Sequence, residues 1–249
     1  DVYFVSNING SPLETDGNGY ISRVDAVSRE VQPRWIDGAA EGITLNAPKG
    51  MAIVGDTLWV SDISVVRGFD RSTGESTSEV SIGGATFLND LAADEDGSLY
   101  VSDSGLEAGE NGFAPSGTAA IHRIDPQGNV ESLVAGEELM GPNGVLATSD
   151  GLWAVTFGGN ELYRVVDGAK TDVVQLPSGS LDGLVELEGG DLLISSWEGS
   201  AIYRGPRTGP FELFIGDVTS PADIGLDAGR GLVLIPSFQN DRVLLQPVE

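Results

Sequence analysis

The chain has 249 residues, and its 38 acidic residues against 13 basic ones give a net charge of −25. Such a surface repels phosphate groups, which excludes nucleic acid and anionic membrane surfaces as partners. The chain contains no cysteine, which excludes disulfides and a thiol nucleophile. The acids are spread along the chain, which favours a role in solubility over a cation-binding patch. Periplasmic or secreted and cytoplasmic locations both stay open.

A short phrase recurs along the chain and organises the rest of the sequence. Its copies are Lys49-Gly50-Met51, Asn89-Asp90-Leu91, Asn143-Gly144-Val145, Asp182-Gly183-Leu184 and Ala222-Asp223-Ile224. Counted from Gly50, the intervals are 40, 54, 39 and 40 residues. A period near 40 with several short strands in each unit is typical of β-propeller blades.

Each repeat can be divided into four strands in chain order. The first strands are 51–54, 91–93, 145–147, 184–187 and 224–226, and the second are 58–62, 99–103, 152–156, 192–196 and 232–237. The third begin near 21, 66, 121, 162 and 202, and the fourth are 31–36, 79–82, 130–134, 172–176 and 211–215. Alternating apolar residues between Gly, Asp and Asn turns predict antiparallel hairpins.

The two ends of the chain predict incomplete blades. Residues 4–7 match a second strand and 20–24 a third, while the last match, 242–245, is a third strand. We therefore expect one domain over residues 1–249, an all-β, six-bladed propeller of four-stranded antiparallel blades whose first and last blades are incomplete. The missing strands predict that the natural gene product is longer at its N-terminus.

The third repeat is longer than the others because of residues 104–119, between its second and third strands. A loop of this length in a compact domain is either functional or disordered.

Candidate functional residues stand just before the first strand of each repeat. Because the first strand of a propeller blade lines the central channel, these residues should point into one mouth of one pore. They are Lys49, Asn89, Asn143, Asp182 and Ala222, with Asp90 and Asp223 one step further on. The ends of the second strands add Asn7, Asp62, Asp103, Ser196 and Ser237 to the same mouth, although serines at such ends are typical of turns.

Oxygen-bearing side chains that converge on one point suit a hard cation, since calcium takes about six to eight oxygen ligands. Asn143 and Asp182 form the strongest pair, and Asn89 is next. A lone Asn or Asp before a strand more often caps a turn, but three in the same slot favour a ligand site. Lys49 could contact a ligand or pair with a rim acid such as Asp90, and Trp197 stands late enough in its strand to border the mouth. The only histidine, His122, falls on a third strand, which disfavours Ser-His-Asp catalysis.

The phrases around Asn89, Asn143 and Asp182 resemble the family of gluconolactonases, senescence marker protein and luciferin-regenerating enzyme. The resemblance covers essentially the whole chain and implies a six-bladed propeller with one divalent cation, calcium before zinc, that hydrolyses small lactones and related esters. It implies Asn143 and Asp182 as metal ligands and Asn89 as an asparagine near the metal or substrate. The family's glutamate ligand has no counterpart here and would fall on the absent first strand.

The resemblance implies metal-assisted ester hydrolysis of a small-molecule substrate. Asp182 would bind the cation and take a proton from water, and Lys49 would orient the substrate, with Asn89, Asp90 and Trp197 beside it. The alternative is a non-catalytic propeller, similar to those with NHL-type repeats, that binds a protein or small molecule at its rim. A condensing enzyme similar to strictosidine synthase is a weaker third possibility. The sequence does not indicate an oligomeric state.

Overall fold

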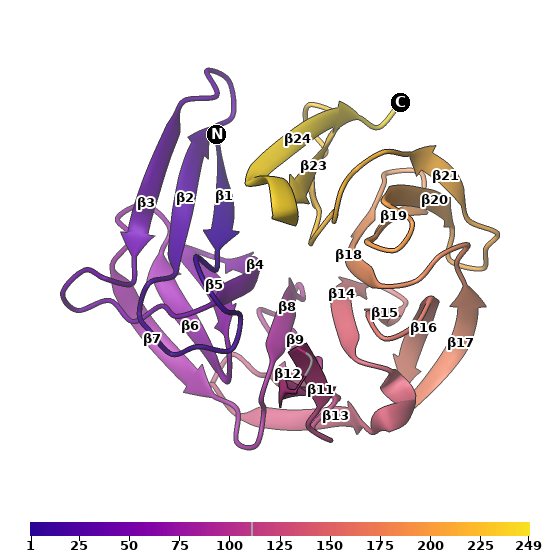
Figure 1. The fold of residues 1–249 in the computed structure, drawn as a ribbon, viewed down its shortest axis with the longest axis horizontal. Helices are drawn as coiled ribbons and strands as arrows, with labels where there is room; N and C mark the ends of the chain where they lie inside the picture. Colours follow the sequence, from indigo (N-terminus) through magenta and orange to yellow (C-terminus); the bar gives the residue numbers. More distant parts are fainter. Residues whose placement is uncertain (111) are drawn as a thin grey trace. The chain divides into compact units, whose positions relative to one another are not determined.

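The computed structural model describes residues 1–110 and 112–249, and over these residues the chain forms 24 strands and two short 3-10 helices. The strands form the antiparallel sheets of a six-bladed β-propeller, and within the described residues the first and last blades have three strands each (Figure 1). The expected fold class is therefore confirmed. None of the described helices is long and apolar enough to cross a membrane.

The described residues divide into two compact units. One consists of Asp1–Thr118 and Arg123–Glu131, and the other of Ala119–His122 and Ser132–Glu249. We refer to them as the N-terminal unit and the C-terminal unit, and each is described by itself.

The first three sheets follow one another in chain order. Their orders are β1-β2-β3, β4-β5-β6-β7 and β13-β12-β9-β8. The strands of the first two are β1 (Val2–Asn7), β2 (Tyr20–Asp25), β3 (Val31–Asp37), β4 (Pro48–Val54), β5 (Thr57–Asp62), β6 (Val65–Asp70) and β7 (Ser76–Ser81). Those of the third are β8 (Leu88–Ala93), β9 (Leu99–Asp103), β12 (Ala120–Ile124) and β13 (Val130–Ala135).

The C-terminal unit contains the last three sheets, with the orders β14-β15-β16-β17, β18-β19-β20-β21 and β22-β23-β24. The first two comprise β14 (Pro142–Thr148), β15 (Gly151–Thr156), β16 (Glu161–Val166), β17 (Ala169–Gln175), β18 (Leu181–Glu186), β19 (Asp191–Ser196), β20 (Ala201–Pro206) and β21 (Glu212–Ile215). The last comprises β22 (Gly225–Asp227), β23 (Leu232–Ser237) and β24 (Arg242–Pro247); the 3-10 helices are η1 (Glu137–Leu139) and η2 (Phe238–Asn240).

The residues predicted to be an extra loop form a separate hairpin. Strands β10 (Leu106–Gly109) and β11 (Gly112–Pro115) pair antiparallel, and the Ser116 N–H donates to the Gly105 carbonyl at 2.8 Å to close the stem. The hydroxyl of Thr86 lies 2.8 Å from that of Ser116 and 2.9 Å from that of Thr118. The hairpin is thus tied to the segment that leads into β8.

The recurring phrase is a β-bulge at the start of the first strand of a blade. The pairing of β14 with β15 shifts between Pro142 and Val145, and the pairing of β18 with β19 shifts between Leu181 and Leu184. The same shift occurs in β4 and in β8. Because a bulge adds one unpaired residue and turns the side chains beside it, it sets the direction of the residues in the predicted slot.

The glycine of the phrase permits the first strands of neighbouring blades to approach closely. A Cβ atom on Gly183 would overlap the backbone of Asp223 and Ile224, and one on Gly144 would overlap the carbonyl oxygen of Asp182. In the N-terminal unit, a Cβ atom on Gly50 would overlap Asp90. Glycine recurs here because no other residue leaves room for the next backbone.

Serines of the second strands hold these bulges in place. Ser195 accepts a hydrogen bond from the Gly183 N–H at 2.7 Å and donates one to the Ala222 carbonyl at 2.9 Å, which links two neighbouring blades. Ser61 donates to the carbonyl of Asn89 in the same way. These buried hydroxyls satisfy backbone groups that the bulge leaves unpaired.

The hydrophobic cores lie between neighbouring sheets within each unit. Leu181, Leu192 and Ile194 of one blade pack with Trp153 and Leu162 of the preceding blade. A second cluster joins the last two blades, and two more occupy the corresponding positions in the N-terminal unit. Since a single sheet cannot bury both of its faces, this packing explains why the repeats are stable only together.

We expect Gly183→Ala to lower the free energy of unfolding by about 2 kcal/mol, because the new methyl group must displace the backbone of the next blade. Urea unfolding followed by tryptophan fluorescence measures the change. Gly189→Ala is the matched control, because a Cβ atom at Gly189 meets no atom within 4 Å. Equal stability of the two variants would contradict the close approach at Gly183.

Candidate functional site

The carboxylate of Asp182 is the most enclosed acidic group of the C-terminal unit. Asp182 stands in the bulge of β18, and only 7% of the residue is exposed. The indole Nε1 of Trp197 donates to its Oδ2 at 2.7 Å, and the side chain of Asn143 also hydrogen-bonds to it. The structure therefore brings Asn143, Asp182 and Trp197 together, three of the residues that the sequence singled out.

Asn143 reaches Asp182 because their strands β14 and β18 touch. Asn143 is 2% exposed and stands next to Gly144, which packs against the Asp182 carbonyl. The bulge in β14 between Pro142 and Val145 frees Asn143 from the regular alternation of the strand. Two residues 39 positions apart in the sequence thus share one small polar enclosure.

The environment of Asp182 disfavours its negative charge. Burial raises the pKa of Asp182 to about 8, and the nearby carboxylate of Asp223 adds to the rise. The hydrogen bonds from Trp197 and Asn143 act in the opposite direction. The group thus combines a desolvated carboxylate, a second carboxylate nearby and two hydrogen-bonding side chains.

This donor set fits a hard divalent cation. Asp182 and Asp223 supply carboxylate oxygens, and Asn143 can supply an amide oxygen, which are ligand types that calcium prefers. A cation would also offset the repulsion between the two acids. Across residues 1–110 and 112–249, no three His, Cys, Asp or Glu side chains gather where they could hold a metal, so a centre built from such residues alone is not present there.

Trp197 belongs to a cluster of three aromatic side chains beside this enclosure. Its ring centroid lies 5.6 Å from that of Phe157 in an edge-on contact and 5.3 Å from that of Phe238 in a tilted one. Trp197 and Phe157 are half-buried, whereas Phe238 is 45% exposed. Unlike Trp153, which packs in the core, Trp197 lies just beyond the end of its strand.

In the N-terminal unit, the ammonium group of Lys49 is enclosed by the chain. Its Nζ donates to the carbonyls of Pro12 at 3.2 Å and Ala47 at 3.0 Å and lies 4.4 Å from the ring centroid of Phe87. Burial lowers the pKa of Lys49 to about 8, and the Asp62 carboxylate opposes this shift. The lysine is thus held by carbonyls and an aromatic face, and Asp62, one of the rim acids considered from the sequence, is the acid that favours its charge.

Asn89 and Asp90 occupy the bulge of β8 in the same unit. Asn89 donates from Nδ2 to the hydroxyl of Ser104 at 3.0 Å, at the base of the hairpin. Asp90 is buried, and its backbone N–H donates to the hydroxyl of Ser102 at 3.0 Å. Gly50, the residue after Lys49, packs against Asp90, so Lys49, Asn89 and Asp90 stand on adjoining strands.

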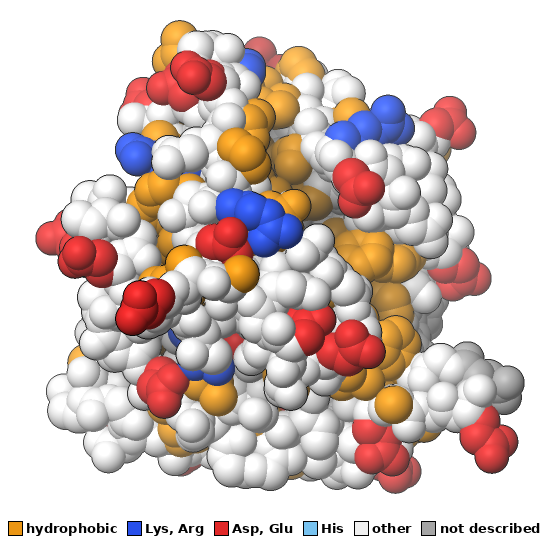
Figure 2. All heavy atoms as spheres, turned by 60° about the vertical axis from the view of Figure 1, so that its left-hand side comes forward, with side chains coloured by type: hydrophobic (Ala, Val, Ile, Leu, Met, Phe, Trp, Pro, Cys, Tyr) orange, Lys and Arg blue, Asp and Glu red, His pale blue; other side chains and the backbone are white. Residues whose placement is uncertain are grey.

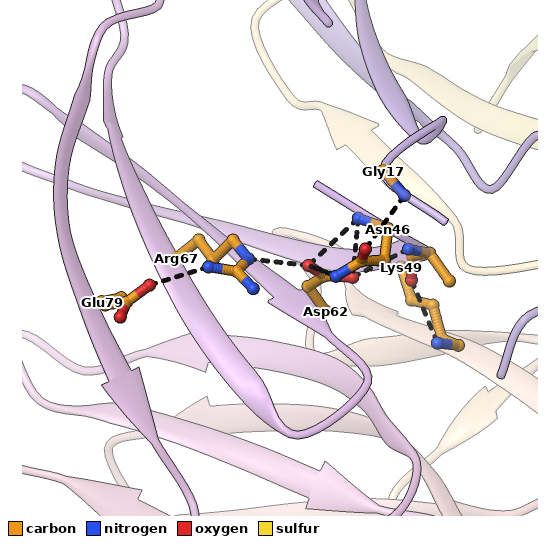
Figure 3. Close-up of polar contacts among 7 residues, drawn as sticks. Gly17, Asn46, Lys49, Asp62, Arg67 and Glu79 are labelled. Carbon is orange, nitrogen blue, oxygen red and sulfur yellow. Dashed lines mark hydrogen bonds and ion pairs between the residues drawn. The ribbon is translucent and has the colours of Figure 1, made fainter. Parts of the chain in front are cut away.

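The polar residues at the ends of the second strands hold loops in place. Asp62 accepts hydrogen bonds from the N–H groups of Asn46 and Ala47 and from the guanidinium of Arg67 at 2.7 Å, and Glu79 binds the other side of Arg67 (Figure 3). Asp103 likewise accepts from the Phe87 N–H at 2.9 Å. Ser196 and Ser237 instead donate to the carbonyls of Gly179 and Thr219. These side chains are engaged by the fold, which accounts for their recurrence without a ligand.

Acidic side chains do not gather in one patch on the surface that Figure 2 shows. Asp and Glu are scattered over this face and are interrupted by neutral and apolar side chains. The distribution agrees with the spread of acids along the sequence and gives no sign of a cationic macromolecule's docking site on this face.

Solved structures with the same fold were found, but no protein-family model and no curated protein matches the sequence. A gluconolactonase from Xanthomonas campestris is 19% identical, over 93% of this chain and 79% of its own, with a TM-score of 0.68. A catalytically inactive variant of virginiamycin B lyase from Staphylococcus aureus, solved with quinupristin, is 18% identical, over 92% and 73%, with a TM-score of 0.65. A chain of a nidogen/laminin complex is 14% identical, over 100% and 90%, with a TM-score of 0.74.

At these identities the likeness shows the fold alone. The neighbours include a gluconolactonase, lyases and a chain of a nidogen/laminin complex, so the same fold occurs in enzymes and in a protein complex. Membership of the gluconolactonase family stays a prediction from sequence motifs.

Sequence reasoning missed Phe238, although a signal existed. Phe157, Trp197 and Phe238 each follow the last residue of a second strand, so aligning the repeats by that position finds all three. It also did not pair Asp223 with Asp182, because the bulge turns side chains in a way that strand alternation does not show.

We expect Lys49→Met to stabilise the protein at pH 7 by about 1 kcal/mol, because it removes a charge that the fold encloses. The pKa of Lys49 is about 8 in the folded protein and 10.5 in the unfolded chain. The enclosed charge therefore lowers the free energy of unfolding by its full amount below pH 8. The stability of the natural protein should then rise relative to the variant between pH 8 and 10.5. Urea unfolding at pH 7, 9 and 10.5 measures this, and a constant difference would contradict it.

Proposed function

We propose that this protein is a metal-dependent hydrolase of small lactones or related esters, with a divalent cation held by Asn143 and Asp182. The observation that carries the proposal is the enclosed Asp182 carboxylate, which receives hydrogen bonds from Trp197 and Asn143 and lies near Asp223. Enclosing such a carboxylate costs folding free energy, and carboxyl groups with strongly perturbed pKa values cluster at functional sites.

The candidate residues would have distinct roles in the reaction. Asn143 and Asp182 would bind the cation. When bound, the cation would supply electrophilic assistance to the ester carbonyl. Calcium fits the oxygen donors better than zinc, which prefers nitrogen and sulfur ligands.

Asp182 is also the proposed base. Its Oδ2 accepts a hydrogen bond from the Trp197 N–H, which fixes the orientation of the carboxylate that would take a proton from the attacking water. Trp197, whose indole N–H bonds this carboxylate, is proposed to contact the substrate.

The test measures hydrolysis of small lactones by the acid that it releases. The rate is compared after metal ions have been removed with a chelator and after Ca²⁺ or Zn²⁺ has been added back. We expect activity only with a cation, calcium giving the higher rate. Asp182→Asn and Asn143→Ala should each lower kcat/KM by about 100-fold or more.

Asp172→Asn is the matched control, because Asp172 is an exposed acid of the same unit that pairs with Arg164 at the surface. It should leave the rate unchanged. Hydrolysis that is indifferent to chelation, or unchanged in both site variants, would refute the proposal.

The second candidate is a binding propeller without catalysis. The hairpin β10–β11 favours it, because Phe113 on β11 is 54% exposed and touches Phe87 edge-on with ring centroids 5.8 Å apart. The nidogen/laminin neighbour shows that the same fold occurs in a protein complex. Absence of hydrolysis with every cation tried would leave this candidate.

Lyase chemistry has less support in this chain. The lyase neighbour is inactive when one histidine is replaced by alanine. The single histidine of this chain, His122, stands on β12, a third strand of its sheet, whereas the candidate ligands stand on first strands.

A further inference from the structure

The C-terminal unit repeats one arrangement in three consecutive blades. Phe157 follows Thr156 at the end of β15, Trp197 follows Ser196 at the end of β19, and Phe238 follows Ser237 at the end of β23. We call these three side chains the aromatic platform. Three aromatic residues at one repeat position, next to the proposed catalytic carboxylate, need an explanation beyond core packing.

The backbone of the platform is fixed in the same way in every blade. The N–H groups of Phe157, Trp197 and Phe238 donate to the carbonyls of Gly141, Ser180 and Ser220 at 2.8, 3.0 and 3.0 Å. Gly141 and Ser180 immediately precede β14 and β18, and Ser220 lies in the segment that leads to β22. The rings are therefore held by the same segments that carry the bulges, which makes the platform a preformed surface.

The rings remain accessible although they touch one another. Trp197 contacts both phenylalanines, and its indole N–H is directed at Asp182, so one edge of the platform ends at the enclosed carboxylate. Phe238 is nearly half exposed. Phe157 also lines a groove of about 440 Å³ with Pro177, Ser178 and Glu198, a volume that suits a small molecule.

The polar neighbours of the platform are engaged elsewhere. Thr156 accepts from the Glu161 N–H at 3.0 Å, Ser196 donates to the Gly179 carbonyl at 2.6 Å, and Ser237 donates to the Thr219 carbonyl at 2.7 Å. A polyhydroxylated sugar lactone can lie on an aromatic face, but its hydroxyl groups need partners around that face. Here the hydroxyl beside each ring is already bonded to loop backbone, so the three rings themselves present an apolar surface. The groove beside Phe157 is lined by polar side chains as well, those of Asn160, Ser178 and Glu198.

We propose that the aromatic platform binds an apolar alkyl or aryl substituent of the substrate, so that the preferred substrates are hydrophobic lactones or esters. This inference rests on the proposed hydrolase function and specifies its substrate class. Transfer of the substituent from water onto the rings supplies binding energy, while the carboxylate edge at Asp182 positions the ester group. Phe157, Trp197 and Phe238 would then determine specificity.

The test separates binding from hydrolysis by using lactams, in which an amide replaces the ester. Calorimetry on the calcium-loaded protein compares an unsubstituted γ-lactam, a γ-lactam with a hexyl chain and gluconolactam. We expect the hexyl lactam to bind at least 10-fold more tightly than either of the others. Phe238→Ala should weaken its binding about 10-fold and leave that of the unsubstituted lactam unchanged, and Phe238→Leu should fall between.

Leu213→Ala is the matched control, since Leu213 is an apolar residue of the same unit that is 65% exposed and lies on β21. It should not change lactam binding. Trp197→Phe keeps a ring but removes the N–H to Asp182, so it should retain affinity for the hexyl lactam. Circular dichroism confirms that each variant is folded before it is compared.

The outcomes distinguish this inference from the proposed function. Equal binding of the three lactams, tighter binding of gluconolactam, or unchanged binding in Phe238→Ala would overturn the role of the platform. Cation-dependent hydrolysis of lactones without preference for the hexyl chain would overturn it while the hydrolase function stands. Platform-dependent binding of the hexyl lactam without hydrolysis of the matching lactone would support the binding role and refute the hydrolase.

Discussion

The contact on which the structure depends is the close approach of one first strand to the next. At Gly183 and Gly144 the neighbouring backbone occupies the space that any side chain would need, and Ser195 ties the Gly183 bulge to the carbonyl of Ala222. This approach has two effects. It brings neighbouring sheets close enough to bury the apolar cores between them, and it places Asn143 within hydrogen-bond distance of Asp182. Stability and the candidate site therefore share one geometric cause.

The repeats separate structural and functional positions that adjoin in sequence. The residue that ends a second strand is polar and bonds loop backbone, as Asp62, Ser196 and Ser237 do. The residue after it is free to differ between blades, and in the C-terminal unit it is aromatic three times. Such a division lets one position maintain the fold while its neighbour faces a ligand. The enclosed carboxylate arises in the same manner, because only some copies of the bulge carry an acid.

The sequence predicted the fold well because its signals are local and repeated. The 40-residue period and the alternating strands determined the six blades, including the three-stranded first and last ones. Comparison of the residues just before each first strand also paired Asn143 with Asp182. It could not show that Ser195 bridges two blades, since a hydroxyl in a strand looks the same whichever backbone group it bonds. The segment 104–119 lacks strand alternation, so its hairpin was not recognisable, and the enclosure of Lys49 depends on Pro12 and Phe87, which are distant in sequence.

The hairpin β10–β11 has a consequence for how this scaffold could change. Its stem is closed by the bond from Ser116 to Gly105, and hydroxyl contacts of Thr86 anchor it from outside the hairpin. The chain leaves β9 and returns toward β12 without altering the register of β8 with β9. Strands β10 and β11 thus form an insert outside the pairing of β8 with β9. Evolution or protein engineering could replace this hairpin to change what the protein binds, while the six blades stay the same.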